Sequence, residues 1–283
     1  MLSKTAGILL ALAVMPAPAQ VPNYVANDTS AGVALPSTVV PRQHEPRRRY
    51  GTAPRVIDNV TVEDSTNWSG YAVEGTGFTQ ALGSWVVPTV NCSTTPNTYS
   101  SFWVGIDGWT SSTVEQTGTD SDCSGRTPSY YAWYEFYPAA SVLISSVPVS
   151  PGNVISASVK WNSGSSFTLT LTNHTTGKTF TKTGNVSGAQ RTSAEWIAEA
   201  PCCTRRGGIL PLADFGTVDL GQDYSGVSST NDATSTGVSG AIGAYGTNVF
   251  ESIMVNGSTG ANEAVPSSLS SDGSSFTVSW FSE

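Results

Sequence analysis

Histidine is scarce in this chain, and its scarcity limits the chemistry that the protein can perform. Among 283 residues there are two histidines, and only His174 lies beyond residue 62, in the part with the character of a folded domain. The four cysteines form no Cys-x-x-Cys pair. Because zinc sites are built from such ligands, we expect no metal and no other cofactor. No clear Ser/His/Asp arrangement of a serine hydrolase is present either.

Charged residues are also few, at 12% of the chain, and they are unevenly distributed. Six of the 13 lysines and arginines lie in the first 60 residues. Residues 61–283 contain 7 basic and 18 acidic residues, a net charge of −11. Such an acidic domain repels phosphate groups, which excludes nucleic acid and anionic membranes as partners.

Long apolar runs are missing, apart from one near the start. Residues 7–15 are apolar, follow Lys4, and precede an Ala-x-Ala site at residues 17–19. The run is too short to span a bilayer, and this pattern is typical of a secretory signal peptide cleaved before Gln20. We therefore expect a signal peptide at residues 1–19 and a secreted, extracellular, monomeric protein with no membrane partner.

An even number of cysteines in an exported chain favours disulfide bonds. Cys92 and Cys123 flank the same motif-rich block, so their pairing is the favoured one among three possibilities. Cys202 and Cys203 are then left to form a bond between neighbours or to stay free.

Residues 63–283 are predicted to form a single all-β domain. Short runs of β-branched and aromatic residues alternate with clusters of Gly, Ser, Asn and Pro, which favours a sandwich or a barrel over helices. Residues 173–178 are typical of a hairpin loop. The clearest predicted strands are residues 81–87, 154–161, 166–171 and 275–281.

The segment Ser193–Glu199 carries two carboxylates four residues apart. In a strand, Glu195, Ile197 and Glu199 share one face, while Trp196 and Ala198 share the other. If Ile197 points inward, Glu199 enters apolar surroundings, and burial raises the pKa of a carboxyl into the range suited to proton transfer. The alternative is a solvated or ion-paired glutamate at the end of a strand.

Further blocks are dense in aromatic residues, glycine and carboxylates. Each alone is typical of core strands or turns, but their joint order is far more specific. The blocks are Asn67-Trp68-Ser69-Gly70-Tyr71, Phe102-Trp103-Val104-Gly105-Ile106-Asp107-Gly108, Val114-Glu115-Gln116-Thr117-Gly118-Thr119-Asp120 and Tyr131-Ala132-Trp133-Tyr134-Glu135-Phe136-Tyr137-Pro138.

Together with Glu-Trp-Ile-Ala-Glu, these blocks resemble the glutamic peptidases, or eqolisins, a family of secreted acid endopeptidases, over about residues 63–283. The resemblance implies a β-sandwich of two antiparallel sheets, of the concanavalin-like or jelly-roll type, with a catalytic glutamine and glutamate. By the match of motifs these are Gln116 and Glu199. Supporting or substrate-binding positions map to Trp68, Trp103, Asp107, Asp120, Trp133, Glu135 and Tyr137.

Roles for these residues follow from the resemblance and from the chemistry of peptide hydrolysis. A carboxyl such as Glu199 can take a proton from water and later give one to the leaving nitrogen. The Gln116 amide can donate a hydrogen bond to the developing oxyanion while its carbonyl orients the water. Asp107 and Glu135 are expected to hydrogen-bond near Gln116, with Asp120 close behind. The aromatic residues are expected to contact substrate, or else to pack in the core.

One stretch departs from the family pattern. The fungal members commonly have an Asp-Phe pair just after the catalytic glutamate, whereas residues 200–208 here contain Cys202-Cys203 and Arg205-Arg206. This difference concerns the local cleft wall and hence the preference for substrate side chains. Arg205 and Arg206 are expected to be solvated or paired with carboxylates.

Residues 20–62 resemble a pro-segment or leader that is largely irregular. They include the basic run Arg47-Arg48-Arg49, which is either a solvated tail or a mask over the acidic domain. In the second case the protein's own pro-segment is a possible inhibitor.

The sequence therefore predicts a secreted, pepstatin-insensitive acid endopeptidase that acts on polypeptides. Two alternatives are a glycosidase that uses Glu135 and Glu199, and a lectin-like domain whose aromatic residues stack on sugars. Gln116 discriminates between them, because neither alternative has a special need for glutamine in that block.

Overall fold

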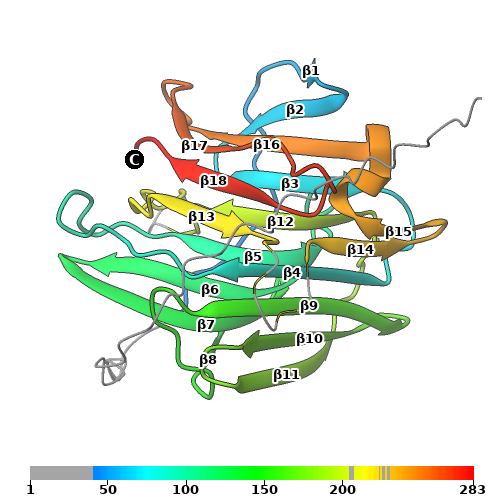
Figure 1. Cartoon of the computed structure of the whole chain (residues 1–283), viewed down its shortest axis with the longest axis horizontal. Helices are drawn as coiled ribbons and strands as arrows, with labels where there is room; N and C mark the ends of the chain where they lie inside the picture. The colour runs from blue at the N-terminus through cyan, green and yellow to red at the C-terminus, as the bar shows by residue number, and fades with distance from the viewer. Residues whose placement is uncertain (1–40, 204–206, 223, 225–226, 228–229) are drawn as a thin grey trace, which may run out of the picture. The chain divides into compact units, whose positions relative to one another are not determined.

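Strands account for nearly all of the regular structure in the computed structural model of this chain (Figure 1). The structure describes residues 41–203, 207–222, 224, 227 and 230–283, which belong to one compact unit. Their single helix is the 3₁₀ helix Ile242–Asn248, and no helix in this range is long and apolar enough to span a bilayer. The predicted signal peptide, residues 1–19, lies outside the described residues, as do Arg205 and Arg206.

The strands form two layers that are continuous at one edge, where β16 pairs with β17. Among the described strands, every pair is antiparallel except β2 with β16, which is parallel. The predicted all-β sandwich is thus confirmed, with this one parallel pair as a correction. Across the first layer the order is β8 (Val142–Ile144), β7 (Thr127–Tyr137), β6 (Val114–Ser124), β5 (Ser101–Ile106), β12 (Ser193–Glu199), β3 (Trp68–Glu74), β16 (Val249–Val255), β2 (Val60–Ser65) and β1 (Arg55–Ile57). Across the second layer it is β11 (Lys178–Asn185), β10 (Ser166–Asn173), β9 (Val154–Ser163), β4 (Gln80–Val86), β13 (Thr217–Leu220), β18 (Phe276–Trp280) and β17 (Asn262–Pro266), with the hairpin of β14 (Asp232–Ser235) and β15 (Val238–Ala241) also paired to β4.

The predicted strands and hairpin agree with the structure. In β10, Phe167, Leu169 and Leu171 are buried while the threonines between them are partly exposed, because side chains alternate between the faces of a strand. The predicted hairpin loop joins β10 to β11. His174 lies in this loop, and its Nε2 is 2.7 Å from the Ser156 hydroxyl.

The described part of the leader has no strand before residue 55. Within the range of the predicted, largely irregular leader, regular structure is limited to β1 and the first residues of β2. Val62 is buried and β2 pairs in register with β16, so this part of the leader is built into the first layer.

The main hydrophobic core lies between the two layers, and it contains one face of β12. Trp196 and Ala198 point into it, as the alternation predicts. The indole N–H of Trp196 donates to the carbonyl of Leu82 at 2.6 Å, and that of Trp85 donates to the Thr119 hydroxyl at 2.9 Å. These bonds satisfy the polar atom of each buried indole. A second cluster, which contains Ile197, lies on the opposite face of the first layer, so β12 is buried on both sides.

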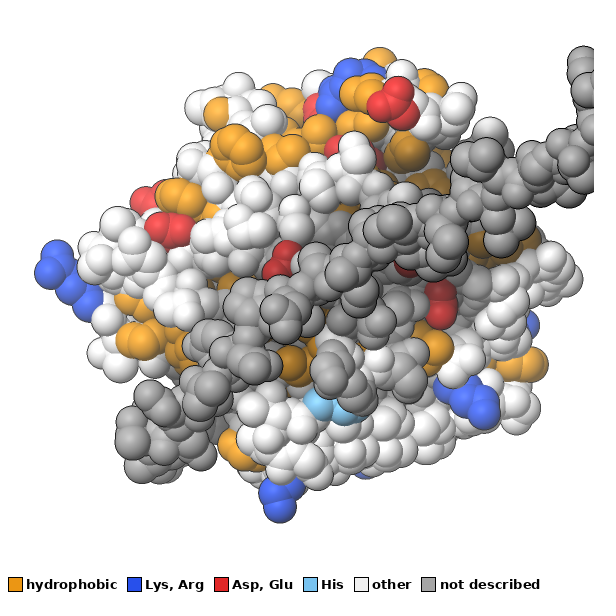
Figure 2. Space-filling view, viewed as in Figure 1, with side chains coloured by type: hydrophobic (Ala, Val, Ile, Leu, Met, Phe, Trp, Pro, Cys, Tyr) orange, Lys and Arg blue, Asp and Glu red, His pale blue; other side chains and the backbone are white. Residues whose placement is uncertain are grey.

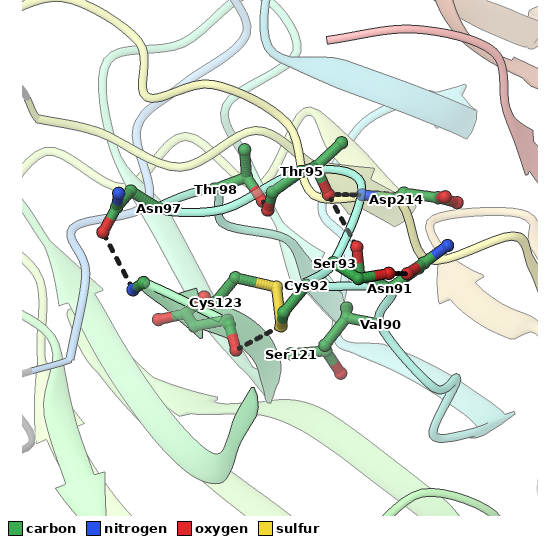
Figure 3. The surroundings of a disulfide bond; sticks show 12 residues. Val90, Asn91, Cys92, Ser93, Thr95, Asn97, Thr98, Ser121, Cys123 and Asp214 are labelled. Atoms are coloured by element: carbon green, nitrogen blue, oxygen red, sulfur yellow. Dashed lines mark hydrogen bonds between the residues drawn. A yellow bond between two sulfur atoms is a disulfide. The ribbon is translucent and has the colours of Figure 1, made fainter. Parts of the chain in front are cut away.

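Both cysteine pairs are joined. The favoured pairing, Cys92 with Cys123, is confirmed, and Figure 3 shows this bond linking the loop after β4 to the end of β6. Cys202 is bonded to Cys203, which decides between the two alternatives left open by the sequence.

We expect loss of the Cys92–Cys123 bond to lower the free energy of unfolding substantially. The bond closes a loop with a sequence separation of 31 residues, and a loop of that size corresponds to about 3–4 kcal/mol of restricted freedom in the unfolded chain. Urea unfolding of a double Cys→Ser variant, compared with the unchanged chain under non-reducing conditions, measures this difference. Equal midpoints for the two proteins would contradict the expectation.

Few charged side chains are visible on one face of the molecule, in agreement with the composition. Figure 2 shows one face on which uncharged atoms dominate, with isolated basic and acidic side chains scattered among them. The chemically distinctive groups are instead buried, on the outer face of the first layer.

Candidate active site

Five adjacent strands of the first layer, β3, β12, β5, β6 and β7, bring the predicted site residues onto one face. Paired residues in neighbouring strands share a face of a sheet. Glu199 pairs with Trp68 on one side and Ser101 on the other, and Ser101 pairs with Asp120. Gln116 pairs with Glu135. We call this the catalytic face, and it is turned away from the second layer.

The glycine of Gln-Thr-Gly has a packing role on this face. A Cβ atom at Gly118 would collide with the carbonyl oxygen of Phe102 and with the side chain of Trp103. The absence of a side chain at Gly118 leaves room for Trp103 on the neighbouring strand. Its indole N–H then reaches Glu199 Oε2 at 2.8 Å.

Glu199 is a fully buried carboxyl with two donors. Besides Trp103, the backbone N–H of Glu45 donates to its Oε1 at 3.2 Å. Burial raises the pKa of Glu199 to about 8, although the positive charge of His44 and the hydrogen bond from Trp103 act in the opposite direction. The carboxyl therefore holds its proton at acidic pH while it is covered.

The amide of Gln116 donates two hydrogen bonds and has one free acceptor. Its Nε2 donates to the carbonyl oxygen of His44 at 2.9 Å and to Glu135 Oε2 at 3.3 Å. Its Oε1 is buried and has no hydrogen-bond partner among the described residues. The amide thus polarises one carbonyl group while its own oxygen remains able to accept a hydrogen bond from water.

His44 is the site residue that sequence reasoning missed. Its ring stacks on Trp133, with centroids 3.6 Å apart and planes 8° from parallel. Nδ1 lies 3.2 Å from Glu135 Oε2, and Nε2 lies 3.2 Å from Asp120 Oδ1. Since both nitrogens face carboxylate oxygens, both must donate, which requires the charged imidazolium.

The surroundings of His44 stabilise that charge. Burial alone lowers the pKa of a histidine, but the charge of Asp120 and the hydrogen bonds to Asp120 and Glu135 outweigh burial and raise the pKa to about 10. No motif marked His44, because it belongs to the leader and its partners lie 76 and 91 residues away in the sequence.

The basic run of the leader also lies against the domain. The Arg47 guanidinium is 3.4 Å from the ring centroid of Trp109 and 2.6 Å from Glu63 Oε2. Arg48 pairs with Glu45, and the more exposed Arg49 lies 3.3 Å from Glu63. The solvated-tail interpretation is therefore wrong for Arg47, which is buried.

The other predicted positions are partly where the motifs place them. Trp68 donates from its indole N–H to the carbonyl of Glu45 at 3.1 Å, and Tyr137 packs against the cluster on the catalytic face. Asp107 is a correction, since its carboxylate does not reach Gln116. Instead it accepts hydrogen bonds from the backbone N–H groups of Gln190, Arg191 and Thr192, which holds the loop before β12 in place.

Glu195 shares the catalytic face with Glu199, as the alternation predicts, and it is fully buried. Burial raises its pKa well above the ordinary value, so Glu195 is a neutral acid at acidic pH.

Potential metal ligands gather at one place among the described residues. The described residues contain one group of His, Cys, Asp or Glu atoms close enough to share an ion, formed by Glu45, Cys202 and Cys203. The two sulfurs of that group are joined to each other and are not available as thiolates.

The site can be compared with those of known proteins through sequence and fold. The model of the peptidase A4 family matches residues 66–280. Aspergillopepsin-2 of Aspergillus niger is 33% identical over 201 residues, covering 63% of this chain and 69% of that relative. Scytalidopepsin B of Scytalidium lignicola is 34% identical over 180 residues, covering 62% and 66%.

Fold comparison agrees with the sequence match. A crystal structure of scytalido-glutamic peptidase with a transition-state analogue inhibitor superposes with a TM-score of 0.63 at 28% identity, covering 76% of this chain and 98% of that chain. These matches select one family among those with β-sandwich folds. The chain belongs to the peptidase A4 family, the glutamic peptidases or eqolisins.

Proposed function

We propose that this glutamic endopeptidase hydrolyses polypeptides in acid with Gln116 and Glu199 as its catalytic pair. One observation carries the proposal: the two side chains contact the two ends of a single peptide bond. Gln116 Nε2 donates to the carbonyl oxygen of His44, and Glu199 Oε1 accepts from the N–H of Glu45. Peptide hydrolysis changes charge and protonation at these same two atoms.

Each side chain has a distinct task in this proposal. Water attacks the carbonyl carbon, Glu199 takes a proton from the water and delivers one to the leaving nitrogen, and Gln116 donates to the oxyanion. The free Oε1 of Gln116 accepts a hydrogen bond from the attacking water. Trp103 holds the Glu199 carboxyl in position.

The leader supports a further part of the proposal, namely that residues 42–50 inhibit the enzyme. We call these residues the covering segment. They occupy the donors and acceptors that a polypeptide substrate would use, since Gln116 donates to the His44 carbonyl and Glu199 accepts from the Glu45 N–H. In the absence of the segment, water reaches the carboxyl and solvates its charged form, which makes a carboxylate base available.

Secretion to the extracellular medium is also proposed, on the basis of the signal peptide at residues 1–19, and so are the monomeric state and insensitivity to pepstatin. The glycosidase and lectin alternatives are not favoured, because the family match assigns the chain to peptidases. In addition, Glu135 Oε2 is engaged with His44 and Gln116.

The catalytic role of Gln116 is tested by digestion of denatured casein at about pH 3–4, with and without pepstatin. The unchanged protein is expected to digest casein equally in both cases. A Gln116→Ala variant loses a single oxyanion donor, for which kcat is expected to fall by about 10²–10³-fold. Full activity of this variant would remove Gln116 from the proposed pair, and inhibition by pepstatin would contradict the assigned mechanism.

A further inference from the structure

A buried arginine lies a short distance along the chain from the peptide bond that Gln116 and Glu199 contact. That bond joins His44 to Glu45, and Arg47 is the third residue after it. The Arg47 side chain is 1% exposed, although arginine is among the residues that are rarely buried without a partner. A charge that is removed from water to this extent needs partners, and the domain supplies them.

Three groups of the domain hold the guanidinium of Arg47. Its Nη1 lies 2.6 Å from Glu63 Oε2, and its Nε donates to the carbonyl oxygen of Trp109 at 3.4 Å. Its central carbon lies over the Trp109 ring, 3.4 Å from the ring centroid. Because an aromatic face attracts a cation and the guanidinium is planar, this arrangement suits arginine better than lysine. We call Glu63 and Trp109 the arginine pocket.

The arginine pocket is built from parts of the fold outside the covering segment. Glu63 lies on β2, and Trp109 follows the end of β5. Between β5 and Trp109, the chain passes through Gly108 with φ of 104°, where a Cβ atom would lie 2.6 Å from a methyl carbon of Val114. The Trp109 ring packs against Phe250 of β16, with centroids 5.5 Å apart. The walls of the pocket therefore belong to the domain and can receive the side chain of another peptide.

Main-chain contacts fix the distance between the catalytic pair and the arginine pocket. The carbonyl oxygen of Glu45 accepts from the indole N–H of Trp68 at 3.1 Å. The backbone N–H of Arg47 donates to the carbonyl oxygen of Gly108 at 3.1 Å. These are backbone atoms of the covering segment, and a polypeptide substrate offers the same atoms, so it can be held in the same register. Its third residue after the cleaved bond then lies at the arginine pocket.

We propose that the arginine pocket selects substrates, so that the enzyme cleaves most readily those polypeptides with arginine as the third residue after the cleaved bond. The inference rests on the proposed catalytic pair, because that pair defines which bond is cleaved. A neutral side chain of the same size would leave the ring and the carboxylate of the pocket without a cation. Trp109 has no group that titrates, so its attraction for the guanidinium persists in acid.

Two peptides that compete for one sample of the full-length protein test this selection. They share one sequence, with histidine before the bond to be cleaved, and differ only in the third residue after it, which is arginine or citrulline. Citrulline has the shape of arginine but no charge. In the mixture, the ratio of cleavage rates gives the ratio of kcat/KM, whatever fraction of the enzyme is occupied by its own covering segment. At about pH 4, we expect the arginine peptide to be cleaved about tenfold faster at this bond, which mass spectrometry of the products identifies.

Two pocket variants and one control assign the preference to the arginine pocket. Trp109→Leu removes the aromatic face and Glu63→Gln removes the carboxylate, and in each the preference for arginine is expected to fall to about threefold or less. Trp161→Leu is the matched control, because the Trp161 ring also lies under a guanidinium, that of Arg191, at 3.8 Å, but on β9 in the second layer. It is expected to keep the full preference. Since each result is a ratio within one sample, a variant that is less active overall does not imitate the expected loss.

The possible outcomes separate this inference from the proposed function. Equal cleavage of both peptides by the unchanged protein would overturn the inference and leave the proposed function standing, as would an arginine preference that both pocket variants retain. Casein digestion without cleavage of either peptide at the intended bond would have the same meaning. If neither casein nor the peptides are hydrolysed, the proposed function itself fails, and the inference fails with it.

Discussion

Glu199→Gln is expected to lower kcat for peptide hydrolysis by about a thousandfold or more, the largest effect of any single substitution in this chain. The glutamine keeps the shape of the side chain and can still accept from Trp103, but it can neither take a proton from water nor donate an acidic one. Hydrolysis of casein or of a fluorogenic peptide by purified protein measures the loss.

Glu195→Gln provides the matched control for that experiment. Glu195 lies on the same strand and the same face, four residues away, and it is equally buried. Its raised pKa makes it neutral in acid, so the amide closely imitates the form already present. Activity within about twofold of the unchanged protein is expected, because no interaction made in the transition state is removed. Equal losses in both variants would indicate a structural effect of removing any buried carboxyl and would contradict the assignment of Glu199.

The second large effect is expected in the titration of His44. Its imidazole should remain protonated far above the ordinary value of 6.5 and lose its proton only near pH 10. A histidine whose pKa is raised in the bound state stabilises that state fully below its ordinary pKa, and the contribution is lost as the pH rises through the bound value. Docking of the covering segment should therefore weaken between about pH 6.5 and pH 10, by up to about three orders of magnitude in its equilibrium constant.

The two-histidine composition makes this measurement simple. In a Glu199→Gln chain, which lacks the catalytic carboxyl, the further change His174→Gln leaves one imidazole to follow by NMR. Adding Asp120→Asn removes the main charge that raises the pKa of His44, and the midpoint should then fall. A midpoint near 6.5 in the chain with Asp120 intact would mean that the segment does not occupy the catalytic face in solution.

Local patterns in the sequence were sufficient to predict the strands. They also predicted which side chains lie on the same face of a strand. The period of two in residues 193–199 predicts that Glu195, Ile197 and Glu199 point one way and Trp196 the other, and the structure agrees. This succeeds because alternation is a property of the backbone of each strand and needs no knowledge of its neighbours. The order of the motifs added the family, and with it Gln116.

The sequence patterns did not predict contacts made by residues just after a strand, where the backbone turns in a new direction. Asp107 follows β5 in a left-handed backbone conformation, with φ of 70°. This conformation turns its carboxylate toward the backbone at residues 190–192 and away from Gln116. Motif spacing places Asp107 near the site, but it contains no information about this change of direction.

The amino-acid sequence by itself therefore determined the all-β class, the strands, the favoured disulfide and the pair of residues that the family motifs mark. Only the tertiary structure decided which peptide bond lies between Gln116 and Glu199, and that His44 is the charged group clamped beside it. The physical reason is distance along the chain. Alternation and motifs are local, whereas the contacts of His44 join the leader to strands 76 and 91 residues away, and only the register of paired strands brings them together.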